Sequence, residues 1–488
     1  MNNNISVRNN KKGIIIHFCL LIVAVLFALF FYRGTSPLFS YYTYDSSVFM
    51  TMGTMLLNGK IMYVDCFDHK GIVLYLIEAL GQLLIPGRWG IFILQVVNLF
   101  LILVFIYKTT KIFQISMNKI VFIIISFLLL FKLSLDEGNQ TEEYCMLFSS
   151  ISLYITFRYY YKTKTLSVKD IFILGLCFSL SFWIRPNNAG VSSICIAFIF
   201  LVLARQGNKR FLIKYSSIVF ISIIAFCAAI CIYFVAKDAF DAMIYSLFSY
   251  NFKYIDKGYQ TNLKELSKTM ILNVSVVGVW ILATYLSYKK NPKKDYNLII
   301  FIILLLLLGV FPVNMRFGHC YYLSLLTPVY AVGMMLLFSI MDFSKKQNKI
   351  LNAFSALLFI ALLCSGFFRF NTYRTMDDAY IESAKNVVSM VPSAQLDNVY
   401  GYQTEAKLYV VTDLKPTFRY FFLQDFLAKS DKRINDSVKE NIESDNTLWV
   451  ITQNDIFKKS SNEGALDALS HDYEKYFSDN YLTLFKRK

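Results

Sequence analysis

Long apolar runs follow one another through residues 14–368 and constrain this chain more than any other feature of its sequence. A helix that spans a bilayer needs about 20 mostly apolar residues, and many of these runs approach that length. Hydrophobic residues make up 56% of the chain and charged residues 17%, whereas a soluble domain carries about 25% charged residues. The composition therefore excludes a soluble or fibrous protein and indicates a polytopic membrane protein.

Eleven of these runs are interpreted as spanning helices. They lie at residues 14–33, 89–108, 119–135, 142–158, 170–184, 189–204, 213–236, 269–288, 297–314, 321–341 and 350–368. One further run, 71–86, is shorter, contains Glu78 and Gln82, and stops at Pro86-Gly87. A run of this length usually lies on a membrane face or enters it only partly. We therefore predict a helix on the outer face over 71–86.

The positions of Lys and Arg set the predicted orientation, because cytoplasmic loops carry an excess of these residues. If 71–86 does not span, most Lys and Arg between the runs fall on the cytoplasmic side, including the lysine-rich loop 289–294. We therefore predict a multi-pass protein of the cytoplasmic membrane with a cytoplasmic N-terminus and a first outer loop at 34–88. The same pattern accounts for the net charge of +16 without a nucleic-acid partner.

The tail after the last run has a different character. From Asp377 onwards it carries more acidic than basic residues. Strand-like runs at 398–402, 408–412 and 448–452 alternate with helix-compatible stretches such as 434–442. We therefore predict two domains, an all-helical transmembrane domain at 1–369 and a small extracytoplasmic α/β domain at 370–488.

Ionisable residues from distant parts of the chain gather in the predicted outer loops. Burying ionisable side chains at the edge of a membrane costs free energy, so a cluster of them indicates a functional site. The candidates are Asp45, Asp68 and Lys70 in the first loop, followed by Glu142, Glu143, Arg185, Arg316 and His319 in later loops.

Each candidate also has a structural explanation that the sequence leaves open. Asp45 would serve as the N-cap of a helix at 46–57. Lys70 would place its ammonium group at the membrane interface, and Asp68 would form a turn. Arg185 would cap a helix end. At least two of the four acids in 136–143 would be solvated loop charges, and a lone histidine is more often structural than catalytic.

An early acid followed by a lysine about 25 residues later suits group transfer from a lipid phosphate to a hydroxyl. The acid can take the acceptor's proton, and cations can stabilise the charge that grows on the phosphate. The chain contains neither a GxGxxG motif after a strand nor a GxxxxGK[ST] motif. Because nucleotide sugars stay in the cytoplasm, a donor at the outer face would be linked to a lipid.

Four segments of the chain carry a family resemblance. They read YDSSVFMTMGTMLLNGKIMYVDCFDHKGIVLYLIEALGQLLIPG, GNQTEEY, FWIRPNNAG and RFGHCYYLSLLTP. They resemble outer-face segments of GT-C glycosyltransferases, in the branch of protein O-mannosyltransferases and aminoarabinose-lipid transferases. Two departures stand out: Ser46 follows Asp45 where the family often has a second acid, and Gly71 follows Lys70 where the family has Lys-Pro-Pro.

The resemblance implies a role for each candidate residue. Asp45 matches the catalytic acid, and Lys70 matches a lysine near the donor phosphate. Arg185, Arg316 and His319 are matched to phosphate or sugar contacts. We further assign Tyr44, Asp68, Glu142 and Glu143 to sugar or acceptor binding. The charge of a monophosphate donor can be stabilised by cationic side chains alone, so we assign no metal ligands. The sequence leaves open whether a divalent metal ion is a cofactor.

The predicted function is an inverting glycosyltransferase in the bilayer that moves a sugar from a polyprenyl-phosphate carrier to an extracytoplasmic acceptor. One alternative is a glycan polymerase or ligase with a lipid-diphosphate donor, which usually concentrates arginines in a late outer loop; loop 237–268 has lysines and no arginine. The other is a lipid or sugar transporter or flippase, which would carry charges within its spans and broken helices.

Overall fold

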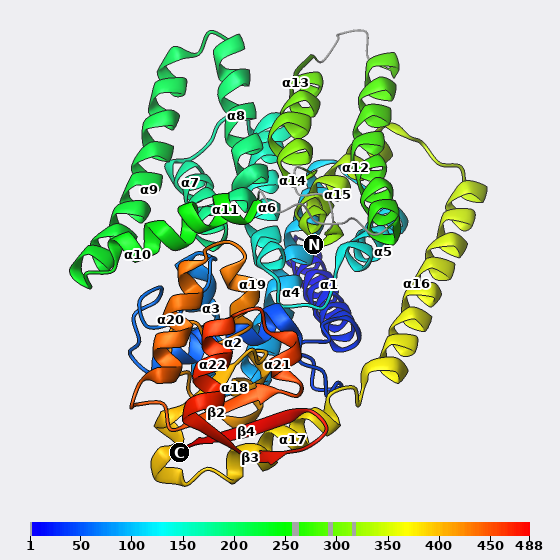
Figure 1. Ribbon diagram of the computed structural model, residues 1–488. Helices are drawn as coiled ribbons and strands as arrows, with labels where there is room; N and C mark the ends of the chain where they lie inside the picture. The colour runs from blue at the N-terminus through cyan, green and yellow to red at the C-terminus, as the bar shows by residue number, and fades with distance from the viewer. Residues whose placement is uncertain (1, 256–262, 291–295, 315–318) are drawn as a thin grey trace. The chain divides into compact units, whose positions relative to one another are not determined.

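The computed structural model describes residues 2–255, 263–290, 296–314 and 319–488 (Figure 1). The chain divides into two compact units, each of which is assembled from segments that lie far apart in the sequence. The first unit comprises Met1–Tyr32, Phe92–Ala229 and Tyr259–Phe370, and the second comprises Arg33–Ile91, Ile230–Gly258 and Asn371–Lys488. The domain boundary at 369/370 stays a prediction; the second unit joins the tail to the segment that contains the predicted first outer loop.

Helices build the first unit almost entirely. In chain order they are α1 (Asn2–Phe31), α4 (Arg88–Ile112), α5 (Met117–Ser134), α6 (Thr141–Arg158), α7 (Val168–Ile184), α8 (Gly190–Arg205), α9 (Lys209–Ala236), α12 (Leu263–Lys290), α13 (Tyr296–Leu304), α14 (Phe311–Asn314), α15 (Thr327–Ile340) and α16 (Lys345–Tyr373). A π-helical turn at Leu305–Val310 continues α13, and a 3-10 helix at Cys320–Leu326 leads into α15.

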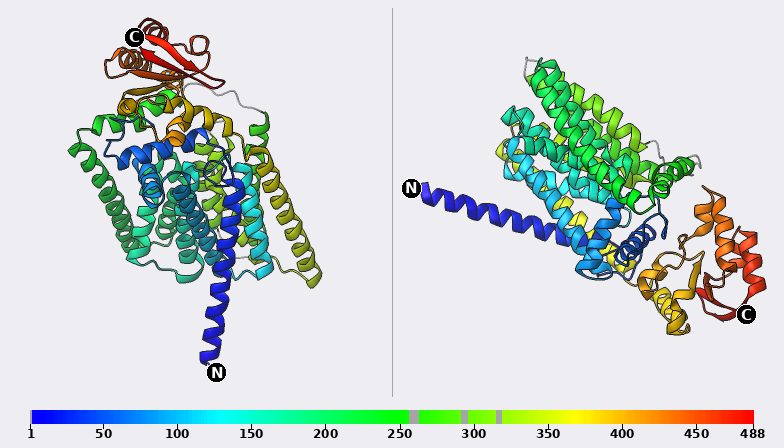
Figure 2. Two further views of the ribbon diagram at one scale, coloured as in Figure 1. Left: turned by 90° about the horizontal axis from the view of Figure 1, so that it is seen from below. Right: turned by 90° about the vertical axis from the view of Figure 1, so that its left-hand side faces the viewer.

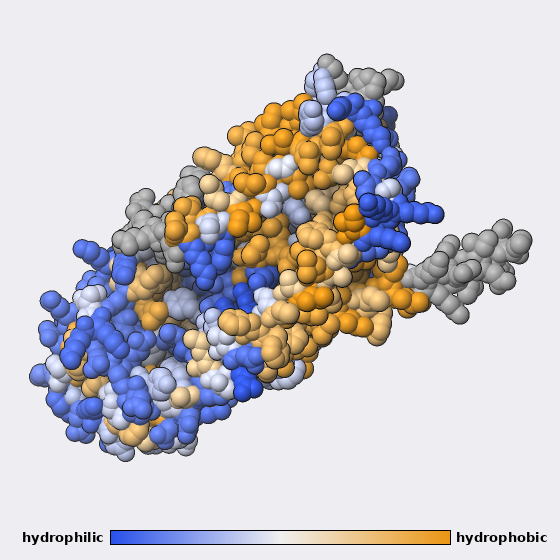
Figure 3. Space-filling model, turned by 90° about the vertical axis from the view of Figure 1, so that its right-hand side faces the viewer, coloured by the Kyte–Doolittle hydropathy of each residue, from blue (hydrophilic) through white to orange (hydrophobic). Residues whose placement is uncertain are grey.

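Eight helical segments within the described residues are long and apolar enough to cross a membrane. They are Gly13–Phe31, Arg88–Ile112, Met117–Ser134, Pro186–Arg205, Lys209–Ala236, Leu263–Lys290, Cys320–Ile340 and a segment that begins at Lys345. Large apolar side chains point outward from these segments, among them Phe220, Val274 and Leu357, and Figure 3 shows apolar side chains gathered over the helical part. The protein is therefore membrane-embedded.

Three other predicted spans form helices with a weaker membrane signature. α6 has 18 residues but carries Glu142, Glu143 and Arg158, and α7 has 17 residues. The run at 297–314 becomes the short helix α13 with its π-helical turn. These helices are shorter than the usual span of about 20 residues, and the count of eleven spans stays a prediction.

The run at 71–86 forms the short helix α3 (Ile72–Leu84) in the second unit. Its 13 residues extend about 20 Å at 1.5 Å per residue, less than the hydrocarbon core of about 30 Å. Gln82 ends the helix by bonding both the N–H and the carbonyl of Gly87, whose φ of 78° suits glycine. Leu76, Leu80 and Leu83 form an exposed stripe on this helix, as expected of a helix in a membrane interface.

The predicted orientation can be tested by labelling cysteines placed in two exposed segments. We expect a membrane-impermeant maleimide to label Lys458→Cys in intact cells but to label Lys346→Cys only after permeabilisation, since both positions are exposed in the structure. The background would carry Cys19→Ser and Cys364→Ser, because both natural thiols are exposed. Labelling of Lys346→Cys in intact cells would instead mean that the predicted inside and outside are exchanged.

The second unit contains a four-stranded sheet in the order β1-β2-β4-β3. β1 (Val399–Tyr402) is parallel to β2 (Trp449–Gln453), and β3 (Tyr473–Ser478) and β4 (Leu482–Arg487) form an antiparallel hairpin, drawn in red in Figure 2. Its helices are α2 (Tyr44–Leu57), α10 (Phe240–Ile244), α11 (Tyr250–Ile255), α17 (Asp378–Ser389), α18 (Lys407–Thr412), α19 (Gln424–Ala428), α20 (Arg433–Glu443), α21 (Ile456–Lys459) and α22 (Glu463–Asp472), with a π-helical turn at Tyr245–Ser249.

These elements confirm part of the predicted tail and correct the rest. The strands predicted at 398–402 and 448–452 correspond to β1 and β2, and the helix predicted at 434–442 corresponds to α20. The strand predicted at 408–412 is wrong, because this run forms the helix α18, which packs on α17 and α2. A short apolar run fits a buried helical turn as well as a strand, and tertiary packing decides between them.

Candidate functional site

Asp45 lies in the first turn of α2, one residue beyond the start of the helix. The N-cap is Thr43, so the alternative in which Asp45 itself caps the helix is wrong. Asp45 is half-buried and makes no hydrogen bond or ion pair with any residue that the structure describes. A carboxylate in a first helical turn is stabilised by the helix dipole, and this one keeps its oxygens available for another group.

Two arginines hold the segment that leads into α2. Arg33 stacks on Tyr373 at 4.1 Å and on Tyr41 at 5.3 Å, measured from the guanidinium carbon to the ring centroid. The guanidinium of Arg88 lies 3.9 Å from the Tyr42 ring centroid and donates to several carbonyl groups of this segment. Its acceptors are the carbonyls of Ser36, Phe39 and Tyr41.

The same segment is bonded to the chain that follows α16. The N–H of Ser40 donates to the carbonyl of Arg374, and the N–H of Asp377 donates to the carbonyl of Ser40, both at 2.7 Å. The carboxylate of Asp377 accepts the N–H of Tyr42 at 2.7 Å. These bonds fix the backbone immediately before Asp45, so the start of α2 has one defined position in the second unit.

Lys70 lies beside the face of α2 that carries Asp45. Its ammonium nitrogen is 5.6 Å from the ring centroid of Phe49. Phe49 follows Asp45 by four residues, and residues four apart lie on the same face of a helix. The structure thus places the Lys70 ammonium beside Phe49, one helical turn after Asp45. Tyr44, also predicted as a site residue, has its ring edge-on to Phe422 and Phe426.

Asp68, His69 and Lys70 form a chain of contacts within one loop. The Lys70 ammonium lies 2.9 Å from His69 Nε2. His69 Nδ1 lies 3.1 Å from Asp68 Oδ1, and the hydroxyl of Tyr75 donates to Asp68 Oδ2 at 2.9 Å. All three loop side chains are largely buried. Asp68 therefore contacts His69, Lys70 and Tyr75, and its assignment to sugar or acceptor binding stays a prediction.

The environment of Asp68 favours its charged form. Burial alone would raise the pKa of this carboxyl, but the charges of Lys70 and His69 and the hydrogen bonds of His69 outweigh it and hold the pKa well below its usual range. The Asp68 carboxylate therefore stays ionised at neutral pH, although only 3% of its side chain is exposed.

Residues of the C-terminal tail contact the backbone of the loop that contains Asp68, His69 and Lys70. Arg419 donates to the carbonyl of Tyr63 at 2.8 Å, and its own carbonyl accepts the N–H of Phe67 at 2.9 Å. The Phe67 ring packs against Tyr420 and Tyr250, with centroid distances of 5.2 and 5.0 Å. The backbone of the loop is therefore held by a segment more than 300 residues later in the chain.

A second tail contact is centred on the buried carboxylate of Asp431. It accepts the hydroxyl of Tyr245 at 2.5 Å, Lys253 at 3.3 Å and a bidentate pair of N–H groups from Arg433. Hydrogen bonds from Arg433, opposed by burial, together with those of Tyr245 and Lys253, hold the pKa of Asp431 well below its usual range. Asp431 therefore joins α20 to the segment of α10 and α11.

This contact predicts a stability that depends on pH. A carboxyl whose pKa is lowered by folding stabilises the protein above its unfolded pKa, near 4, and this contribution disappears as the pH falls toward the folded pKa. We expect Asp431→Asn to lower the free energy of unfolding by about 1–3 kcal/mol at pH 7, and the difference from wild type to shrink below pH 4. Thermal unfolding in detergent across this pH range would measure it.

The control for that measurement is Asp445→Asn, which removes a fully exposed carboxylate that pairs with Arg487. It should change stability by less than about 1 kcal/mol at any pH. If Asp431→Asn destabilised the protein equally at pH 3 and pH 7, the ionised Asp431 would not be the source of the effect.

The first unit contains a buried ion pair. Arg185 Nη1 donates to Glu142 Oε1 at 3.0 Å, and Nη2 donates to the hydroxyl of Tyr322 at 3.0 Å. The Arg185 guanidinium also lies 4.6 Å from the Tyr322 ring centroid. His319 has its ring 6.1 Å from that of Tyr322. Arg185, Glu142 and His319 are thus brought together around Tyr322, and Arg316 lies outside the described residues.

Glu143 points into a separate set of contacts. Its carboxylate accepts Gln95 Nε2 at 2.9 Å, and its carbonyl accepts Asn98 Nδ2 at 2.8 Å. Both Glu142 and Glu143 are almost fully buried, whereas Asp136 is exposed and Glu137 half-buried, so any solvated charges among the four acids are the first two. The assignment of Glu142 and Glu143 to sugar or acceptor binding stays a prediction.

Within the described parts of the chain, no three His, Cys, Asp or Glu side chains are grouped to hold a metal ion.

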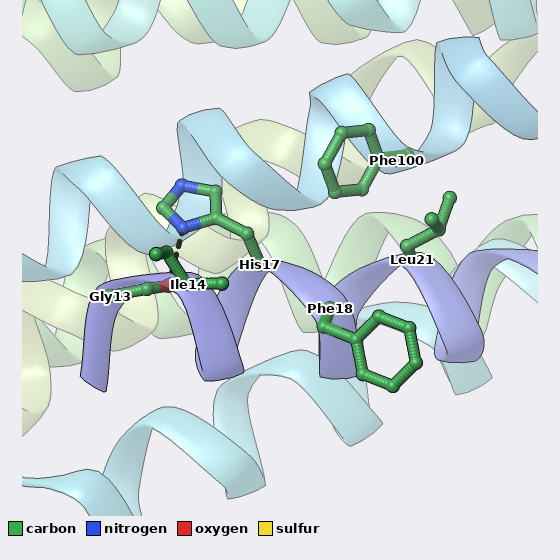
Figure 4. Close-up of a pocket in the computed structure, with 6 residues that line it drawn as sticks. All are labelled: Gly13, Ile14, His17, Phe18, Leu21 and Phe100. Carbon is green, nitrogen blue, oxygen red and sulfur yellow. Dashed lines mark hydrogen bonds between the residues drawn. The ribbon is translucent and has the colours of Figure 1, made fainter. Parts of the chain in front are cut away.

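Two cavities lie away from these candidate residues. One, of about 200 Å³, is lined by Met50, Thr54 and Met55 of α2, among others. At 100° per residue Met50 and Thr54 lie about 140° and 180° around α2 from Asp45, whereas Met55 lies about 80° from it. The other, of about 530 Å³, is an apolar opening over α1 and α4 lined by Gly13, Ile14, His17, Phe18, Leu21 and Phe100 (Figure 4). His17 Nδ1 donates there to the carbonyl of Gly13.

Sequence reasoning missed several residues of these clusters. His69 stands between Asp68 and Lys70 and could have been noticed as part of an acid–histidine–lysine run. Tyr322 lies in the segment RFGHCYYLSLLTP, beside the histidine that was selected. Gln95 and Arg419 carry no local signal, because each acts on a side chain or backbone far away in the sequence.

Comparisons with known proteins bear on the fold. No protein-family model and no curated protein matches the chain. Among solved structures, the chain is similar to ArnT from Cupriavidus metallidurans in the apo state, with a TM-score of 0.58 and 10% identity over 98% of each chain. A second structure of that protein, bound to undecaprenyl phosphate, gives a TM-score of 0.47 and 10% identity over 97% of this chain and 98% of that chain. The chain therefore has the GT-C fold of ArnT, as its sequence resemblance led us to expect.

Proposed function

We propose that this protein is an inverting glycosyltransferase that moves a sugar from a polyprenyl-phosphate carrier to an acceptor at the outer face of the membrane. The observation that carries this proposal is the position of Lys70, in the loop before α3, beside the face of α2 that carries Asp45. Asp45 offers a half-buried carboxylate, and the Lys70 ammonium lies one helical turn further along, at Phe49. A base and a cation so arranged suit transfer from a phosphate to a hydroxyl.

The proposed reaction is a single displacement. The acceptor's hydroxyl oxygen attacks the anomeric carbon while Asp45 removes its proton, and the bond from that carbon to the phosphate oxygen breaks. The sugar is thereby inverted at the anomeric carbon, and the carrier leaves as a phosphate monoester with one more negative charge. Lys70 stabilises this charge, which is larger in the transition state than in the bound donor.

The fold shared with ArnT supports a donor linked to a polyprenyl phosphate. ArnT, whose fold this chain has, is also known as a complex with undecaprenyl phosphate, and we infer a polyprenyl phosphate as the lipid partner here. The fold alone does not carry an activity from one protein to another, so the reaction rests on the residues around Asp45.

The remaining candidates keep subsidiary roles in the proposal. Arg185 and His319 are proposed to contact phosphate or sugar, and the same role is proposed for Arg316 on the sequence alone. Tyr44, Glu142 and Glu143 are proposed for sugar or acceptor binding. Asp68 is also proposed for sugar or acceptor binding, and its contacts in addition hold His69, Lys70 and Tyr75 in place.

The test uses the full-length protein in liposomes with radiolabelled donors. We expect transfer from a polyprenyl-monophosphate sugar to endogenous acceptors in a membrane extract, and none from a polyprenyl-diphosphate glycan. Transfer from the diphosphate alone would favour a polymerase or ligase. Movement of the labelled lipid between leaflets without any product would favour a flippase, and either result would overturn the proposal.

A further inference from the structure

The chain of contacts from Asp68 through His69 to Lys70 defines the state of the histidine. The Asp68 carboxylate lies 3.1 Å from His69 Nδ1, outside hydrogen-bond geometry, and a proton on Nδ1 avoids the repulsion between two facing lone pairs. An ammonium group can only donate, so His69 Nε2, 2.9 Å from Lys70 Nζ, must carry none. The two contacts together favour a neutral imidazole with its proton on Nδ1.

The surroundings of His69 hold this arrangement in place. Asn251 Nδ2 donates to the carbonyl of His69 at 2.9 Å, and the Tyr250 ring packs on the imidazole with centroids 5.6 Å apart. The hydroxyl of Tyr63 donates to the carbonyl of Lys70 at 2.8 Å. The His69 side chain is 11% exposed, so it has little room to turn away.

The contact with His69 orients the ammonium group of Lys70. An ammonium carries three N–H donors on a flexible stem with rotatable bonds. One donor is directed at His69 Nε2, and this fixes the directions of the other two. A cation placed in advance stabilises developing charge better than one that must reorganise during the reaction.

We propose that His69 is a positioning residue that holds Lys70 for the carrier phosphate and does so only as a neutral imidazole. This inference rests on the proposed function, because it assigns Lys70 to the departing phosphate. Asp68 contacts both partners, because its Oδ1 lies 3.1 Å from His69 Nδ1 and 3.8 Å from the Lys70 ammonium. His69 itself touches neither donor nor acceptor in this scheme.

A dependence on pH follows from the role of the neutral form. Protonation of His69 removes the lone pair that accepts from Lys70 and puts a second positive charge beside the ammonium. The titratable and charged groups that face the imidazole include Asp68, Lys70 and Tyr250, with Tyr63 and Tyr75 bonded to the same loop. Histidine is the side chain that ordinarily changes charge between pH 5 and 8, so transfer should slow as the pH falls through this range.

The experiment compares pH profiles of kcat for wild type, His69→Gln and His69→Phe. Glutamine offers an acceptor oxygen to Lys70 and does not titrate. We expect His69→Gln to keep kcat within about threefold of wild type at pH 8 and to lose part of the decline at acid pH. His69→Phe offers no acceptor and should lower kcat by up to about 100-fold at pH 8, the cost of a misplaced catalytic group.

The matched control is His471→Gln. His471 also contacts an aspartate, Asp472, with Nδ1 2.7 Å from its carboxylate, but its side chain is 89% exposed. This variant should keep the wild-type profile. An acid decline in His69→Gln identical to that of wild type, or a wild-type kcat in His69→Phe, would overturn the role of His69 while leaving the proposed transfer intact. Absence of transfer by wild type would overturn the proposed function and this inference together.

A second readout does not depend on folding of the variants or on activity. The chain has four histidines, and nitrogen-15 NMR of histidine-labelled protein distinguishes the two neutral tautomers. At pH 8 we expect the buried histidine signal to show a proton on Nδ1 and none on Nε2. A proton on Nε2 of His69 would exclude the contact with Lys70 and with it the proposal.

Discussion

Replacing Asp45 by Asn should lower the rate of sugar transfer by about 100- to 10,000-fold, the usual contribution of a positioned general base. Asparagine has nearly the same size and keeps an acceptor oxygen at the start of α2, so the fold should persist. It cannot take a proton from the acceptor's hydroxyl. The measurement is kcat for the radiolabelled monophosphate donor in liposomes, at equal amounts of folded protein.

Loss of the helix-dipole interaction is the competing explanation, and Asp378→Asn controls for it. Asp378 is an exposed aspartate in the first turn of α17, so its replacement removes the same kind of interaction, worth about 0.3–1 kcal/mol. We expect Asp378→Asn to transfer sugar at the wild-type rate. Normal transfer by Asp45→Asn would remove Asp45 from the mechanism.

Replacing Arg185 by Met should lower the free energy of unfolding by about 3–5 kcal/mol, because it leaves the buried Glu142 carboxylate without its cation. The Arg185 and Glu142 side chains are 9% and 1% exposed, so water cannot take the place of the guanidinium. Adding Glu142→Gln should restore most of the loss, since a neutral amide needs no counter-charge. Denaturant unfolding in detergent of the single and double variants would give the coupling between the two residues.

A more exposed ion pair supplies the comparison. Arg158 and Asp170 lie 2.6 Å apart, with side chains 26% and 17% exposed. Arg158→Met should cost about 1 kcal/mol or less, as for ion pairs that water reaches. If Arg185→Met cost no more than this, the pair with Glu142 would not be an important element of the first unit.

The architecture could be predicted from the sequence where local patterns are strong. Apolar runs of about 20 residues require helices in a bilayer, and the alternating tail indicated strands at β1 and β2. The hairpin of β3 and β4 was not predicted. Three residues in the middle of β3 are exposed, and β4 pairs with β2, about 30 residues earlier in the chain. Such pairing depends on partners that a local pattern does not reveal.

The candidate site shows the same limit. Asp45 and Lys70 could be selected because acids and bases are rare in an apolar chain and these two lie in one predicted outer loop. The distant contacts that hold the backbone of the loop before Lys70 could not be selected in this way. Arg419 reaches the carbonyl of Tyr63 across 356 residues of sequence, and nothing near either residue indicates the other.

The contact between Arg419 and the Tyr63–Phe67 loop also sets an order of events during synthesis. Arg419 and Tyr420 lie beyond the last apolar helix, α16, so they leave the ribosome after the membrane helices. A nascent chain whose helices are already inserted still lacks the hydrogen bonds that fix this loop. The Tyr63–Phe67 loop is therefore fixed last, when the tail folds, and a half-made chain in the membrane still lacks the finished surroundings of the proposed site.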